Sequence, residues 1–235
     1  MKSSRNGTGT GKAIVFDSGT LISFVMSGLT EEFEKLKGIF KGKFIITEEV
    51  KKEVIDTPLH IKRFELEALK INHLLSKGII EMPSALGFKS QEISAMARKA
   101  LEIANNTYVG NGKEIHIIDS AEASCVALAK MMKEKGIDSA IAIDERTMRM
   151  LGEMPENLGK LLEKRLHVKI NFRKENFEFF RGLKFIRSSE LVFVAYKKGL
   201  VDLKGKEVLD ALLYGVKTKG CAISDDEISE IKRMA

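Results

Sequence analysis

The sequence predicts an α/β protein with a doubly wound, parallel five-stranded sheet flanked by helices and followed by a helical C-terminal extension. Short runs of β-branched and apolar residues alternate along the chain with longer stretches of helical periodicity. Strands that alternate with helices build a parallel sheet, which the helices cover. No internal repeat interrupts this pattern, so we expect one compact domain.

The periodicity assigns each element to a stretch of the chain. The expected strands are residues 13–16, 44–46, 79–81, 140–143 and 168–170. Helical periodicity is clearest in residues 48–56, 61–76, 91–106, 120–135, 156–166, 189–198, 206–218 and 225–234. The Asn- and Gly-rich residues 105–116 have the composition of an internal loop.

The first twelve residues are polar and rich in Gly, Ser and Thr, which predicts a disordered leader, with the fold beginning at Ala13. The run GTGTGK does not fit a Walker loop, because Asn6 stands where that loop needs glycine and because it precedes a strand. We expect residues 13–166 to form the main domain, with residues 167–235 supplying the last strand and the C-terminal helices packed on it.

Composition favours a soluble cytoplasmic protein, because no apolar run is long enough to span a membrane and the first residues lack an apolar signal segment. Cys125 and Cys221 lie far apart and suggest neither a disulfide framework nor a zinc site, and Cys125 is expected to be buried. The net charge of +6 fits a polyanionic partner and equally fits ordinary solubility of a Lys-rich chain.

Acidic residues follow two of the predicted strands. Asp17 comes directly after residues 13–16, with Ser18 beside it, and Asp144 and Glu145 come directly after residues 140–143. The carboxyl ends of parallel strands lie at one edge of a sheet, where sites form. Asp17 also has the residue type of a helix N-cap, which is the competing structural interpretation.

Further acidic residues lie in the helical stretches. Glu53 is too far into its helix to be a cap, although a solvated Glu- and Lys-rich face also explains it. Asp119 and Glu122 stand three apart where an apolar helix begins, which is equally the pattern of a capping box. Carboxylates gathered at one edge repel one another unless a hard cation neutralises them, which favours Mg²⁺ or Mn²⁺ and phosphodiester hydrolysis.

The order of these segments resembles the PIN domain family. VFDSGTLI is similar to its first acidic motif, ITEEVKKEVI to the second, IDSAEASCVALA to the third and AIDERTMR to the last. The tail from Ser188 resembles the helical ending of VapC-like, archaeal-type prokaryotic members.

The resemblance implies a PIN-type ribonuclease, a hydrolase that uses Mg²⁺ or Mn²⁺, in residues 13–166. Its catalytic, metal-binding acids would be Asp17, Glu53, Glu122 and Asp144, with Asp119 and Glu145 as further ligands. It also implies RNA as substrate, often a homodimer, and leaves open an antitoxin-like inhibitor protein.

Several basic and polar side chains are expected to contact the RNA. Between residues 160 and 187 basic residues interleave with phenylalanines, although these rings are more often core residues than base-stacking platforms. The expected substrate-binding residues are Ser18, Arg146, Arg149, Lys164, Arg165 and Arg173.

Two other functions compete. A phosphatase of the haloacid dehalogenase class shares the FDSGT pattern but needs a second acid where Gly19 stands. A non-catalytic PIN-fold scaffold that binds RNA or protein stays open, because a fold does not guarantee activity.

Overall fold

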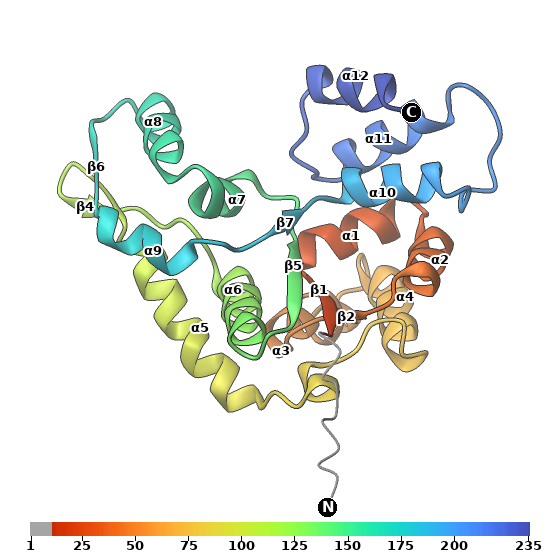
Figure 1. Cartoon of the computed structure of the whole chain (residues 1–235), viewed down its shortest axis with the longest axis horizontal. Helices are drawn as coiled ribbons and strands as arrows, with labels where there is room; N and C mark the ends of the chain where they lie inside the picture. Colours follow the sequence, from red (N-terminus) through yellow and green to blue (C-terminus); the bar gives the residue numbers. More distant parts are fainter. Residues whose placement is uncertain (1–10) are drawn as a thin grey trace, which may run out of the picture.

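The computed structural model describes residues 11–235, and its centre is a four-stranded parallel sheet in the order β2-β1-β5-β7 (Figure 1). The strands are β1 (Lys12–Phe16), β2 (Lys43–Ile45), β5 (Asp138–Ala142) and β7 (Phe185–Ile186). β1 and β5 pair from Lys12 opposite Asp138 to Phe16 opposite Ala142. Both strands therefore end together at one edge of the sheet.

Helices surround this sheet and extend from it to either side (Figure 1). The α-helices are α1 (Ser18–Met26), α2 (Thr30–Ile39), α3 (Glu48–Lys51), α4 (Glu65–Ser76), α5 (Ser90–Asn105), α6 (Ser120–Glu134), α7 (Arg146–Glu153), α8 (Pro155–Leu166), α9 (Phe177–Phe180), α10 (Ser188–Lys197), α11 (Val208–Thr218) and α12 (Asp225–Arg233). A π-helix, η1 (Lys52–Asp56), continues α3, and the 3₁₀ turns are η2 (Pro58–His60), η3 (Pro83–Leu86) and η4 (Lys174–Asn176).

Two of the five expected strands do not join the parallel sheet. Residues 79–81 contribute only a bridge between Glu81 and Ile45, because Pro83 begins a 3₁₀ turn immediately afterwards. Residues 168–170 overlap β6 (Ile170–Phe172), which pairs antiparallel with β3 (Tyr108–Gly110) in a separate sheet that also holds β4 (Lys113–Glu114). The two-residue strand β7, which the sequence did not indicate, takes the outer place beside β5 instead.

The eight helical stretches are all found, with changed boundaries, but α1, α2, α7 and α9 lie outside the predicted stretches. α1 is buried around most of its circumference, at Thr20, Leu21, Ser23, Phe24 and Val25, so it has little of the one-sided periodicity that marks a surface helix. A helix without a clear polar face is hard to recognise from its periodicity.

An aromatic cluster packs β1 and β2 against α1 and α2. Phe16 lies 5.0 Å from Phe33 and 4.9 Å from Phe44, measured between ring centroids, and Phe24 lies 5.3 Å from Phe33. Edge-to-face rings at these separations add about 0.5–1.5 kcal/mol per pair to the apolar burial. The end of β1 is thereby held in a rigid core.

The two ends of the chain differ from expectation in small ways. Lys12 already pairs with Asp138, so the fold begins before Ala13. Residues 1–10 of the predicted leader lie outside the described residues.

Both cysteines are free and buried. Within residues 11–235, none of the helices has the length and apolar character needed to cross a membrane.

Candidate active site

Asp17 stands at the centre of the candidate site. Its backbone N–H donates to the Ala142 carbonyl at 2.9 Å, which extends the β1–β5 ladder by one step. Its Oδ2 accepts from the Gly19 N–H at 3.2 Å and so caps α1, as the structural interpretation predicted. The residue is only 6% exposed, yet its Oδ1 is buried without any hydrogen-bond partner. A buried acceptor left unpaired costs about 1–3 kcal/mol, and more when charged.

Asp119 and Glu122 begin α6 and form the capping box that the sequence allowed. The Glu122 N–H donates to Asp119 Oδ1 at 2.9 Å, and the Asp119 N–H donates to Glu122 Oε2 at 3.0 Å. Glu122 is nevertheless buried, which a cap does not require. One carboxylate oxygen of each residue makes no hydrogen bond to another described residue.

Burial and the charges of neighbouring carboxylates raise the pKa values of Asp17 and Glu122. Burial, with the charges of Asp119 and Glu53, raises the pKa of Asp17 to about 7, although hydrogen bonds from the Gly19 and Ser18 backbone act in the opposite direction. Burial also raises the pKa of Glu122 to about 8, with the charges of Asp17, Asp119 and Glu145 acting in the same direction. We call Asp17, Glu53, Asp119, Glu122 and Glu145 the acidic cluster.

Glu53 reaches the cluster from the π-helix η1 and stays exposed at its rim. Partial burial raises its pKa, hydrogen bonding from Ser18 lowers it, and the Asp119 charge raises it again. Ser18, an expected substrate-binding residue, therefore lies beside Glu53. π-Helical turns are rare and occur frequently at functional sites, since they change where a side chain points.

Asp144 does not join the acidic cluster. It is 2% exposed, and its carboxylate accepts from the Ser188 N–H and hydroxyl, both at 2.8 Å, while its carbonyl accepts from Ala222 N–H at 3.0 Å. Asp144 thus holds the start of α10, and the neighbouring Glu145 is the strand-end acid that acts on Glu122. Glu145, the second acid expected at this strand end, caps α7, because its oxygens accept from the Thr147 hydroxyl at 2.7 Å and from the Met148 N–H at 2.9 Å.

The donor atoms of the cluster suit a hard cation in type, but as placed they do not form a complete ligand set. Among the described residues, no group of three or more His, Cys, Asp or Glu side chains is arranged to hold a metal ion. The capping bonds explain this, because they turn oxygens of Asp119 and Glu122 toward the backbone. The unpaired Asp17 Oδ1 is the atom that a cation would satisfy best.

Arg146 and Arg149 line a pocket of about 440 Å³ between α7 and residues 222–227. Burial lowers the pKa of Arg149, as does the nearby Arg187, and the Arg149 Nε is buried without a partner. Arg187 itself pairs with Glu190 and Glu227. Arg149 therefore has a buried, unused donor in this pocket.

The other expected RNA contacts lie elsewhere. Lys164 and Arg165 are exposed in the last turn of α8, and Arg173 is held by the Asn106 carbonyl at 2.8 Å and by Glu114 at 3.3 Å. Arg173 directly follows β6, and β6 lies away from α1 (Figure 1). Phe172 and Phe177 pack with each other and with Tyr108, so the core interpretation of these rings is confirmed.

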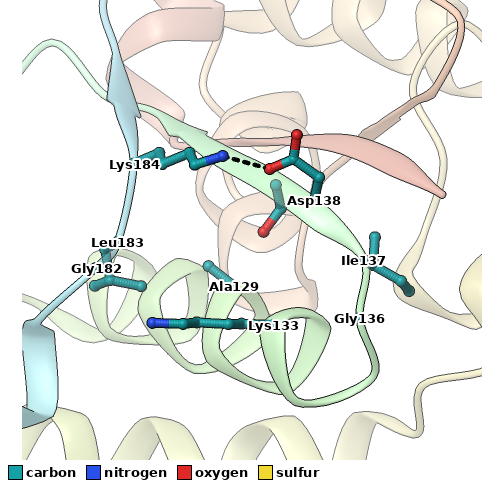
Figure 2. A pocket seen from close by; sticks show the side chains of 9 residues that line it. Ala129, Lys133, Gly136, Ile137, Asp138, Gly182, Leu183 and Lys184 are labelled. Carbon is teal, nitrogen blue, oxygen red and sulfur yellow. Dashed lines mark hydrogen bonds and ion pairs between the residues drawn. The ribbon is translucent and has the colours of Figure 1, made fainter. Parts of the chain in front are cut away.

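A pocket of about 340 Å³ lies at the opposite edge of the sheet (Figure 2). Its wall includes Asp138 at the start of β5, whose carboxylate pairs with Lys184 at 2.6 Å. It contains one carboxylate rather than several, and that charge is neutralised. The buried carboxylates with raised pKa values, Asp17 and Glu122, lie at the other, carboxyl edge.

Fold and site together define an α/β protein with an acidic cluster at the carboxyl edge of a parallel sheet. Neither a family model, nor a curated protein, nor a solved structure matches this chain. Sequence reasoning did not predict the roles of Ser188, Arg187 and Glu227, whose hydrogen bonds connect the C-terminal helices to this edge. Such pairs join residues far apart in the chain and leave no local sequence pattern.

Proposed function

We propose that this protein is a PIN-type endoribonuclease that hydrolyses RNA phosphodiester bonds with Mg²⁺ or Mn²⁺ held by the acidic cluster. One observation carries the proposal: Asp17 Oδ1 is buried and unpaired, and burial, together with the charges of Asp119 and Glu53, raises the pKa of Asp17 to about 7. Such an arrangement destabilises the protein unless a cation offsets it, and strained electrostatics of this kind cluster at functional sites.

The position of each acidic residue determines its proposed role as a metal ligand. Asp17 and Glu122 are the inner ligands, and each must release the proton that its raised pKa retains near neutrality. Asp119 and Glu145 complete the set from the starts of α6 and α7, with Glu53 at the rim. A bound divalent ion supplies an activated water and offsets the charge that grows on the phosphoryl oxygens.

The substrate side follows from the basic residues next to the cluster. Arg146 directly follows Glu145, Arg149 lies about one helical turn further along α7, and the unpaired Nε of Arg149 suits a phosphate oxygen. Ser18 offers a hydroxyl beside Glu53. RNA as the substrate, a homodimer and an antitoxin-like inhibitor come from the PIN resemblance and belong to the same proposal.

A second candidate is a non-catalytic scaffold that binds RNA or protein. The capping box favours it, because Asp119 and Glu122 each commit one oxygen to a backbone N–H. The two candidates differ in what a divalent ion does: a nuclease requires it for turnover, whereas a scaffold does not.

The deciding experiment incubates end-labelled single-stranded RNA with the full chain in Mn²⁺, in Mg²⁺ and in chelator. We expect metal-dependent cleavage that Asp17→Asn reduces at least 100-fold, on the order of 3 kcal/mol of transition-state stabilisation. Asp138→Asn is the matched control, because that residue lies on the neighbouring strand at the opposite edge. Equal cleavage by wild type and Asp17→Asn would contradict the nuclease and favour the scaffold.

A further inference from the structure

A mostly apolar pocket of about 310 Å³ opens beside the acidic cluster. It lies between α1, the η1–η2 turns and the start of α4. Its lining includes Met26, Glu53, Ile61, Phe64, Glu67 and Ile71. Glu53 belongs both to this wall and to the acidic cluster, so a single ligand can reach both.

The rim of the pocket leaves large apolar side chains in water. Met26, Ile61 and Phe64 are 44%, 42% and 41% exposed, although neighbouring residues such as Ile71 are fully packed. The guanidinium of Arg63 lies 5.3 Å from the centre of the Phe64 ring. An aromatic face with an arginine beside it is the combination that stacks nucleobases.

The charges of the lining select the part of a nucleotide that can enter. Glu53 and Glu67 are the ionisable residues of the lining, and both would repel a phosphate. A neutral planar heterocycle meets no such repulsion, and its amino groups can donate to these carboxylates. The volume is at the small end of ligand pockets, which fits one base better than a folded element.

We propose that this pocket takes one unstacked nucleobase of the RNA strand, next to the phosphate that lies at the acidic cluster. The inference rests on the proposed function and gives it a substrate class: single-stranded RNA, or a loop, in which one base can leave the stack. Because stacking on Phe64 supplies most of the binding, the pocket requires a base at this position. Stacking does not depend strongly on which base it is, so several bases should bind.

The test is an abasic scan of RNA binding. A labelled single-stranded RNA, with one abasic site moved through every position, is titrated with Asp17→Asn protein in Mg²⁺ and followed by fluorescence anisotropy. We expect one position at which the missing base weakens binding about tenfold. Phe64→Ala should weaken binding of the intact RNA about tenfold and remove the dependence on that position.

Two further variants separate the pocket from general loss of structure. Ile61→Ala trims another apolar side chain of the lining and should reproduce the pattern more weakly, whereas Leu66→Ala should leave the scan unchanged. Leu66 is the matched control because it is 59% exposed, apolar and close to Phe64 in sequence, but does not line the pocket.

The outcomes also separate this proposal from the nuclease. A position-specific loss in RNA that wild type never cleaves would support the pocket and contradict the enzyme. Cleavage with equal tolerance of every abasic site, or equal effects of Phe64→Ala and Leu66→Ala, would overturn the pocket alone. A dimer that light scattering detects in wild type but not in Phe64→Ala would assign the pocket to a second copy and overturn the proposal.

Discussion

Asp17 and Asp144 are both buried acids that follow neighbouring strands, but their different surroundings give them opposite effects on the stability of the fold. Asp144 receives two hydrogen bonds from Ser188, whereas Asp17 receives one from Gly19 and leaves Oδ1 unpaired. A carboxylate with two short donors stabilises the fold, and one that is desolvated and repelled destabilises it. Sequence position alone could not distinguish the two, since the difference lies in partners from distant segments.

This contrast predicts opposite effects on stability. Asp17 holds its proton up to about pH 7 when folded but only to about 3.8 when unfolded, so folded protein binds more protons in between. Stability of the metal-free protein therefore falls as the pH rises through that window, by about 1.4 kcal/mol per pH unit from this group. Asp17→Asn should be more stable than wild type at pH 8 and nearly equal to it at pH 4.

Asp144→Asn is the counterpart, and should lose about 1–3 kcal/mol because Ser188 keeps its donors while the charge that strengthens those bonds is removed. Urea unfolding of both variants at pH 4 and pH 8, with chelator present, measures the two effects. A loss of stability in Asp17→Asn at pH 8 would show that its carboxylate is well accommodated and that the site is not strained.

At the scale of elements, one chain of hydrogen bonds aligns the helix that carries Glu53 with the helix that carries Glu122. The Val50 N–H donates to Thr47 Oγ1, whose hydroxyl lies 2.6 Å from Ser124 Oγ, and Ser124 in turn donates to the Ala121 carbonyl. All these groups are buried, so the chain fixes α3 against α6 in one register.

We expect Thr47→Val and Ser124→Ala to be coupled. Each single change leaves a buried partner unsatisfied and should cost about 1–3 kcal/mol, whereas the double variant should cost less than the sum. Both should also lower kcat for RNA cleavage more than they raise KM, because Glu53 loses its position relative to α6. Additive stability losses in the double-mutant cycle would contradict this account.

The elements that could be predicted were those whose signal is local. β1 and β5 are apolar runs that end in acids, and the capping box of α6 follows directly from Asp119 and Glu122. β7 has only two residues, so no pattern within it could indicate a strand. Its place beside β5 depends on long-range hydrogen bonds from Ser188 to Asp144 and from Arg187 to the Ala222 carbonyl. The direction of the Asp144 side chain depends on the same distant contacts.

At the scale of the whole molecule, the C-terminal segment is part of the frame of the site. β7 completes the parallel sheet, Ser188 and Ala222 bond to Asp144, and α10 packs against α1 and α2 (Figure 1). The expected boundary at residue 166 therefore separates strands of one sheet. The acidic cluster lies where the first strand, the α6 helix and this returning segment meet.

The most direct test of the account is a titration of metal-free protein with Mn²⁺ at pH 8, followed by electron paramagnetic resonance of the free ion. We predict saturable binding by wild type and Asp138→Asn, at least tenfold weaker binding by Asp17→Asn, and weaker binding by wild type at pH 6, where Asp17 and Glu122 retain protons. Identical titrations for wild type and Asp17→Asn would show that the acidic cluster is not a cation site.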